Sequence, residues 1–409
     1  MPTLRLSLVD LHARFLATAL AFAAGGALLL PEPADASRRR GGGAPLEAQG
    51  FALFTSPQAN PIALSADGTE LYVANTTSNT VDVISTASNT VTSTVRVGID
   101  PVAVAPRPGS SEVWVSNHVS DSVSVIDTSL VPPEVSQTVQ DIGGDRVTDF
   151  DEPVGIAFNA AGTKAYVALS SRNEIAVVDT STYSVTNRLS ISAQDPRALT
   201  VANGLLYVAA FESGNQSELA ACLSTDPQGF DQCSLDDNDL AAFAQDPNLP
   251  GLDKNIVIDT DLPDRDLFVF DTNDDSAVDT VTGIGTLLYG VAADSSGTAY
   301  LSLTNARNDA NGRTCNTVNN ATCNSAGGDS DVNGDNDDNL QDLQNRIFEN
   351  LIAEVSCTAG GGCGSVTLTD LEPSLPATAD DAAQDGSELA TPYGIRVSGD
   401  GSTLVVTAA

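Results

Sequence analysis

The stretch from Asp329 to Phe348 reads DSDVNGDNDDNLQDLQNRIF, and its side-chain oxygens have a spacing that suits a metal ion. Calcium takes about six to eight hard oxygen ligands at flexible distances. In one twelve-residue window, Asp or Asn occupies positions 1, 3, 5, 7, 9 and 12, with position 7 expected to supply a backbone carbonyl. The alternative is an acidic loop that is only solvated. The predicted calcium ligands are Asp331, Asn333, Asp335, Asp337, Asn339 and Asp342.

The same segment, DVNGDNDDNLQD, resembles the calcium loop of dockerin repeats, which runs D-x-N-G-D, then N, and ends on D. It departs from the usual EF-hand loop because Gly334 stands at position 4, Asn336 takes the sharp turn at position 6, and Asp342 replaces the final Glu. Asn tolerates such a turn. The resemblance covers about twenty residues, so it implies a calcium-binding geometry and not a cohesin partner.

The apolar residues after this loop have two interpretations. Leu340, Leu343, Ile347, Leu351 and Val355 recur at helical spacing, which predicts a helix. Part of the segment RIFENLIAEVSC fits a β-strand instead, and periodicity leaves that choice open.

An internal repeat predicts the fold that positions these residues. Units that start at Pro61, Pro101, Pro153 and Pro196 lie 40, 52 and 43 residues apart. They share an apolar run after the proline, a turn, an aromatic residue and alternating apolar runs, which is the pattern of four short strands. The period is that of a propeller blade, which buries its faces only against neighbouring blades.

The segment LYVANTTSNTVDVISTASNTV, from Leu71, resembles the YVTN β-propeller repeat of bacterial exported and surface proteins. The sequence therefore predicts an all-β chain, with a β-propeller of about five complete four-stranded blades and a partial sixth over residues 51–409. The partial blade, TPYGIRVSGDGSTLVVTAA, favours a propeller that is incomplete at its C-terminus, or one that FALFT, residues 51–55, closes. The resemblance implies binding, scaffolding or enzyme-associated roles without selecting among them.

Two long insertions interrupt the repeat, at about residues 212–264 and 304–346. The aromatic residue and the middle valine of the next strand are 11 residues apart in the first three units but 62 apart in the fourth, from Tyr207 to Val269. Both insertions fall between a second and a third strand. Since strands alternate in direction, both insertions and all six cysteines should lie on one face of the ring.

The charge of the chain excludes one class of partner. Asp and Glu outnumber Lys and Arg by 54 to 18, for a net charge of -36, so no nucleic-acid partner is expected. The segment from Glu212 to Asp266 holds thirteen acidic residues against Lys254 and Arg265. This imbalance makes the face with the insertions the candidate surface for a cation or a partner.

The N-terminus has the pattern of an export signal. Two arginines accompany an apolar run from Phe15 to Leu30, and residues 34–36 match A-x-A. We predict a signal peptide over residues 1–36 and a flexible leader over residues 37–50. An uncleaved anchor is the alternative, because Arg38–Arg40 follow the site closely. No membrane span is expected after signal removal, which places the protein in the periplasm, at the cell surface or outside the cell.

Six cysteines form three close pairs, as expected where export exposes a chain to oxidising conditions. No C-x-x-C-H motif is present, so no haem is expected in this chain, and the two histidines argue against zinc. The predicted disulfides join Cys222 to Cys233, Cys315 to Cys323, and Cys357 to Cys363.

These patterns favour an exported, non-catalytic binding or scaffold module that uses one acidic face for a protein, glycan or small ligand. Calcium and disulfides are expected to hold the insertions rigid. Two alternatives stay open. The segment DLPDRDLFVFDT and the long insertions are similar to exported propellers joined to dihaem cytochrome c peroxidase-like regions, which implies one portion of a larger redox protein. A surface-layer or adhesion role fits the same features.

Overall fold

The computed structural model describes most of the repeat and part of the insertions. Residues 58–214, 264–306, 348–371 and 391–408 are described in full, together with the backbone of four short strands inside the insertions. These residues form strands and two 3-10 turns, Thr76–Ser78 and Ser170–Arg172. Within them, no helix is long and apolar enough to cross a membrane. The predicted signal peptide, leader and FALFT segment lie outside the described residues.

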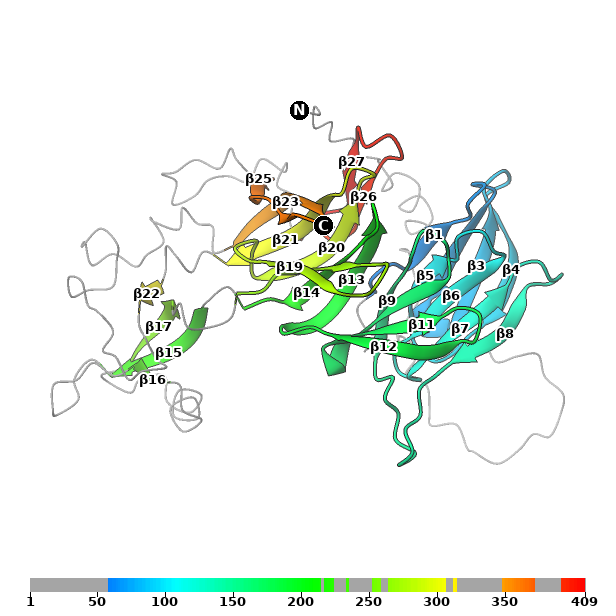
Figure 1. Ribbon diagram of the computed structural model, residues 1–409, viewed down its shortest axis with the longest axis horizontal. Coiled ribbons are helices and arrows are strands. Elements are labelled where there is room, and N and C mark those ends of the chain that lie inside the picture. Colours follow the sequence, from blue (N-terminus) through cyan, green and yellow to red (C-terminus); the bar gives the residue numbers. More distant parts are fainter. Residues whose placement is uncertain are drawn as a thin grey trace, which may run out of the picture.

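The strands form antiparallel blades that follow the chain order (Figure 1). Blades one to three are β1 (Ile62–Leu64), β2 (Glu70–Asn75), β3 (Thr80–Ser85) and β4 (Thr90–Arg96); β5 (Pro101–Pro106), β6 (Glu112–Asn117), β7 (Ser122–Asp127) and β8 (Glu134–Val139); and β9 (Pro153–Phe158), β10 (Lys164–Leu169), β11 (Glu174–Asp179) and β12 (Ser184–Ser190). Blade four is β13 (Gln194–Ala202), β14 (Leu205–Glu212), β18 (Leu267–Asp271) and β19 (Ala277–Val281). Blade five is β20 (Leu287–Ala293), β21 (Thr298–Ala306), β23 (Phe348–Thr358) and β25 (Thr367–Asp370), and the partial sixth blade is β26 (Ile395–Val397) with β27 (Leu404–Val406).

The repeated aromatic residues form the core between blades. Tyr72, Trp114, Tyr166 and Tyr207 are at most 3% exposed. Each lies directly opposite the middle valine of the third strand in the same blade. Directly opposed residues project on the same side of a sheet, so each pair packs against the neighbouring blade. The predicted β-propeller, with five complete blades, a partial sixth and two insertions, is confirmed.

Blade five resolves the choice between helix and strand. The strand β23 pairs with β21 along its length, from Thr298 opposite Ser356 to Ala306 opposite Phe348. The helix prediction is therefore wrong for residues 348–358, and the strand prediction is correct. The physical reason is that β21 would otherwise leave its backbone N–H and C=O groups unpaired on that side. Leu340, Leu343 and Ile347 lie outside the described residues.

The first strands of the blades surround the propeller axis. Contacts run in order from β1 through β5, β9, β13 and β20 to β26, and these strands follow an arc through the middle of the molecule in Figure 1. Two hydrogen bonds then join the sixth blade to the start of the first. Tyr393 donates its hydroxyl to the carbonyl of Gln58 at 2.5 Å, and the Arg396 guanidinium donates to Asn60 Oδ1 at 2.9 Å. The described residues therefore bring the two ends of the ring into contact.

On one face of the propeller, the second strand of each blade ends and the third begins, and we call this the insertion-bearing face. A recurring hydrogen bond joins neighbouring blades there. An Asn or Asp oxygen near the start of the third strand accepts the backbone N–H of the residue before the next blade's proline. That donor residue has a φ between 47° and 62° in each case. The bonds join Asn79 to Asp100 (2.9 Å), Asp121 to Glu152 (3.0 Å), Asn173 to Asp195 (2.9 Å) and Asn350 to Thr391 (3.2 Å).

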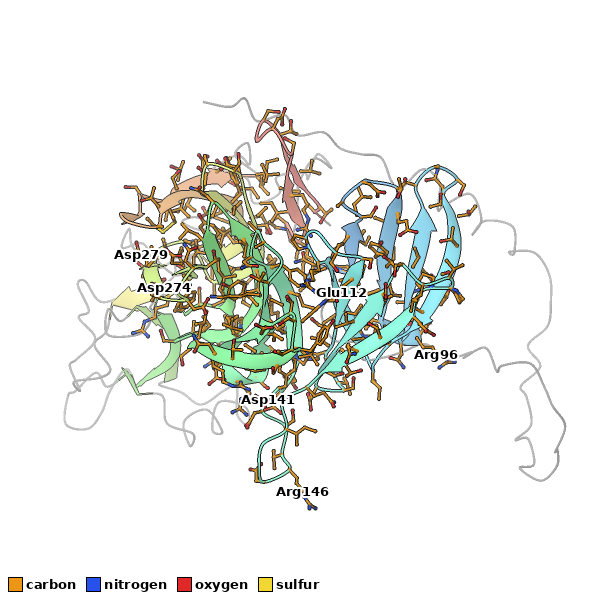
Figure 2. The ribbon with its side chains drawn as sticks, turned by 45° about the vertical axis from the view of Figure 1, so that its right-hand side comes forward. Arg96, Glu112, Asp141, Arg146, Asp274 and Asp279 are labelled. Atoms are coloured by element: carbon orange, nitrogen blue, oxygen red, sulfur yellow. A yellow bond between two sulfur atoms is a disulfide. The ribbon has the colours of Figure 1, made fainter. Side chains whose placement is uncertain are left out.

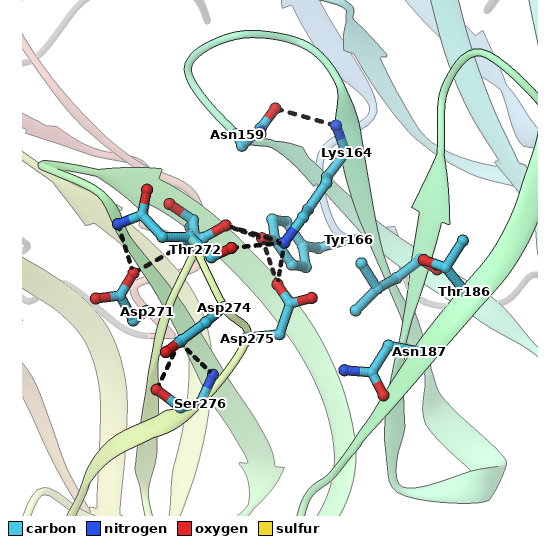
Figure 3. Close-up of polar contacts among 12 residues, drawn as sticks. Asn159, Lys164, Tyr166, Thr186, Asn187, Asp271, Thr272, Asp274, Asp275 and Ser276 are labelled. Atoms are coloured by element: carbon cyan, nitrogen blue, oxygen red, sulfur yellow. Dashed lines mark hydrogen bonds and ion pairs between the residues drawn. The ribbon is translucent and has the colours of Figure 1, made fainter.

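Other contacts join the blades on the opposite face, which carries the turns between first and second strands and between third and fourth strands. Figure 3 shows the contact between blades three and four, where Lys164 donates to Asp275 Oδ1 at 2.9 Å and to the carbonyl of Thr272 at 3.1 Å. The Tyr166 hydroxyl donates to the same Asp275 oxygen at 3.0 Å. Because these side chains have partners within the protein, we assign them a role in stabilising the contact between the two blades.

Candidate functional site

The predicted site residues fall partly within the described structure. All six predicted calcium ligands, from Asp331 to Asp342, lie outside the described residues, as do Cys315 and Cys323. Cys357 and Cys363 form a disulfide. The backbone register places Cys222, on β15 (Ser217–Leu223), directly opposite Cys233, on β16 (Cys233–Ser234).

The expectation that all cysteines share the insertion-bearing face is wrong for one pair. Cys357 lies near the far end of β23, where its N–H donates to the carbonyl of Gly297 in the turn between β20 and β21. Cys363 N–H donates to Asp279 Oδ2 of blade four at 2.7 Å. Because residues 348–358 form a strand that crosses the blade, this disulfide is carried to the opposite face.

The two insertions meet in one small sheet. In the first insertion, β15 pairs with β16 and with β17 (Leu252–Ile258). The second insertion contributes β22 (Gly312–Thr314), which runs parallel to β17 with Ile256 opposite Gly312. Figure 1 shows this sheet beside blades four and five. Segments more than fifty residues apart in sequence thus build one structure next to the insertion-bearing face.

A cluster of aromatic and arginine side chains lies at the axis on the same face. Arg197 comes from β13, Phe211 from β14 just before the first insertion, Tyr289 from β20, and Tyr393 from the lead-in to β26. The Arg197 guanidinium carbon lies 4.3 Å from the centre of the Phe211 ring. The Phe211 and Tyr289 rings are 5.8 Å apart, and those of Tyr289 and Tyr393 are 5.6 Å apart. We call these four residues the axial cluster.

The axial cluster has a defined electrostatic character. Arg197 forms an ion pair with Asp195, whose other carboxylate oxygen is buried without a hydrogen-bond partner among the described residues. Burial raises the pKa of Tyr393, and the charge of Arg197 acts against that rise. Tyr393 is therefore a neutral donor at physiological pH. A guanidinium beside three aromatic rings suits recognition through charge and stacking.

A hairpin projects from the same face between β8 and β9. It turns at residues 143–146 and carries Arg146 at its tip and Asp141 at its base (Figure 2). Arg188 of blade three holds the base through an ion pair with Asp141 at 2.7 Å and a hydrogen bond to the carbonyl of Asp149 at 2.7 Å. The apolar side chains of Ile142 and Val147 are each 60% exposed. The hairpin adds a third projection to the insertion-bearing face.

The axial cluster was not foreseen from the sequence, because its members share no spacing and come from three blades. The one available signal was the position of Arg197, Tyr289 and Tyr393 close to the starts of their repeats. Among the described residues, no group of three or more His, Cys, Asp or Glu side chains could hold a metal ion. The site seen in this part of the chain is therefore one of aromatic and charged groups.

The sequence matches no family model and no curated protein. Solved structures with a similar fold include hydrazine synthase from Kuenenia stuttgartiensis, which is 18% identical, with 88% of this chain and 76% of that chain covered and a TM-score of 0.55. A candidate 6-phosphogluconolactonase from Bacteroides uniformis is 12% identical, with 87% and 80% covered and a TM-score of 0.47. The first likeness concerns the fold alone. Together with the blades described above, it identifies this chain as a β-propeller.

Proposed function

We propose that this chain is an exported binding module, of the YVTN repeat type, that holds its ligand on the insertion-bearing face. The observation that carries the proposal is the pairing of β17 with β22, because it joins both insertions in one sheet beside blades four and five. The axial cluster includes Phe211, which is the next-to-last residue of β14, the strand from which the first insertion leaves blade four. The disulfide between Cys357 and Cys363 supports an oxidising compartment.

The chemistry of the face favours a ligand with a polar or anionic group and a stacking surface. Arg197 supplies charge, and the rings of Phe211, Tyr289 and Tyr393 supply apolar surface for stacking. Such a ligand is a glycan, a small molecule or a protein side chain. Neither a base nor a nucleophile is needed for this role, which is binding and not catalysis.

Substitution of Arg197 tests the proposal. The intact chain is screened against arrayed glycans and secreted proteins, and the best binder is titrated against wild type, Arg197→Ala and Arg96→Ala. Arg96 is an exposed arginine on the outer strand β4, so it controls for loss of one positive charge. We expect Arg197→Ala to weaken binding about tenfold or more, as for a central contact, and Arg96→Ala to leave it unchanged. Equal losses in both variants contradict the proposed site.

Calcium is proposed to stabilise the second insertion through the loop from Asp331 to Asp342. Titration of calcium into the chain from Ser37 onward is expected to give saturable heat with a dissociation constant on the order of 10⁻⁴ M, as in extracellular calcium modules. The double variant Asp331→Ala with Asp335→Ala is expected to lose that heat, because it removes two of the charged ligands. Equal heats in both proteins, or none in either, would identify the segment as a solvated acidic loop.

A further inference from the structure

Two aspartates stand at the root of the first insertion. The stretch described in full before the insertion ends at Gly214, and the next one begins at Asp264, just before β18. Asp264 and Asp266 are two residues apart on extended chain, so their side chains project to the same side. Arg265, between them, is exposed and directs its guanidinium to the carbonyl of Ser192 at 3.4 Å. The two carboxylates therefore face the blade without a cation from their own strand.

Each carboxylate is held by a backbone N–H of the loop between β19 and β20. Gly283 donates to Asp264 Oδ2 at 3.1 Å, and Ile284 donates to Asp266 Oδ2 at 2.7 Å. These bonds take the place of the bonds from Asn or Asp to the backbone that join the other neighbouring blades on this face. The second oxygen, Oδ1, of each carboxylate is buried and finds no donor among the described residues, and Asp266 as a whole is 0% exposed.

Two neighbouring carboxylates whose Oδ1 atoms are both buried without a donor cannot both carry full charge unless a cation or a proton lies between them. Burial and the nearby charge of Asp264 together raise the pKa of Asp266 to about 7, against the hydrogen bond from the Ile284 N–H. Elsewhere around the pair, Glu212 at the end of β14 is exposed, and Asp279 on β19 accepts the N–H of Cys363. The loop of residues 282–286 contains no titratable side chain.

We propose that Asp264 and Asp266 share one proton between their Oδ1 atoms, and that this proton latches the root of the first insertion to the loop of residues 282–286. The proton turns a repelling pair into a hydrogen-bonded one, while both Oδ2 atoms keep their backbone donors. Loss of the proton leaves two negative charges close together at a buried site, and their repulsion favours opening of the loop that supplies the two backbone donors. The inference rests on the proposed function in one respect, because the latch fixes the insertion beside the ligand face.

The direction of the pH dependence follows from the raised pKa. The folded protein binds this proton more tightly than the unfolded chain, in which an Asp has its ordinary pKa of 3.8. The latch therefore contributes most stability below that value. Its contribution is lost as the pH rises from there through about 7.

Amide hydrogen exchange at Gly283 and Ile284 in the intact chain, corrected for the intrinsic pH dependence of exchange, tests the latch. Between about pH 6 and about pH 8, protection is expected to fall about tenfold in wild type, since one proton is lost over that range. Asp266→Asn keeps an acceptor for Ile284 and supplies a neutral donor to Asp264, so its protection should not change with pH. Asp274→Asn, at an exposed turn, should behave as wild type.

Protection in wild type that does not change with pH, or a pH dependence that survives in Asp266→Asn, would overturn the shared proton. A second outcome would also overturn it: millimolar calcium restores protection at alkaline pH in wild type but not in Asp266→Asn. The two carboxylates would then share a cation and not a proton. The exchange is measured without ligand. If exchange shows no shared proton, the binding result for Arg197→Ala still stands. If the screen finds no ligand, the exchange result still stands.

Discussion

Replacing Trp114 by alanine is expected to lower the free energy of unfolding by about 3–5 kcal/mol, the usual range for deleting a large buried aromatic side chain. Trp114 is fully buried and packs edge to face against Phe158 of the next blade, with ring centres 5.4 Å apart. Its indole N–H also donates to Glu112 Oε2 at 3.0 Å. The variant therefore loses apolar burial and leaves a cavity between blades two and three. Chemical denaturation followed by circular dichroism measures the change.

Trp114→Phe is the matched control. It keeps a ring in the same space, and Glu112 keeps its ion pair with Arg107 at 2.9 Å and its hydrogen bond from Tyr183 at 2.8 Å. We expect this variant to lose clearly less stability than Trp114→Ala. A loss below about 1 kcal/mol in Trp114→Ala, the size of an ordinary surface effect, would show that this position is not part of the core.

Replacing Gly155 by alanine is expected to destabilise the protein by about 3 kcal/mol, at the upper end of the usual overpacking cost. A Cβ atom there would lie 2.1 Å from the carbonyl oxygen of Arg197 and 3.3 Å from its carbonyl carbon. Both are backbone atoms of β13, so the first strands of blades three and four must move apart. The same displacement shifts Arg197, so we expect ligand affinity to fall together with the free energy of unfolding.

The control for this substitution is Gly144→Ala. Gly144 lies in the projecting hairpin, where an added Cβ meets no atom within 4 Å. We expect a change within about 0.5 kcal/mol, as at most surface positions. Thermal denaturation of the two variants beside wild type makes the comparison. Similar losses at both positions would contradict the close approach of β9 and β13.

The fold could be predicted because its signals are local. The spacing of 11 residues from Tyr72 to Val83 is the length of one hairpin, so the aromatic and the valine become direct cross-strand partners. The helix prediction for Leu351 and Val355 failed for the opposite reason. Their apolar spacing fits a helix, but the open edge of β21 recruits the segment as a strand. Tertiary pairing overrode the local pattern.

The site could be predicted only in outline. The sequence indicated the face, since both insertions occupy the same connection, but not the pairing of β17 with β22 between them. The contact of Arg197 with Phe211 forms across the register shift between β13 and β14, and that of Tyr289 with Tyr393 depends on the packing of blades five and six. Asp264 and Asp266 were visible as neighbouring acids. Their burial and missing donors follow from the packing of blades four and five and have no sequence signal.

The most direct test of the account maps the ligand onto one face of the propeller. Hydrogen exchange of the intact chain is measured with and without the binder identified by the screen. We expect slowed exchange at residues 194–197, 211–213 and 287–289, which surround the axial cluster and the root of the first insertion. Slowed exchange confined to the turns at residues 107–111 and 159–163, on the opposite face, would contradict it.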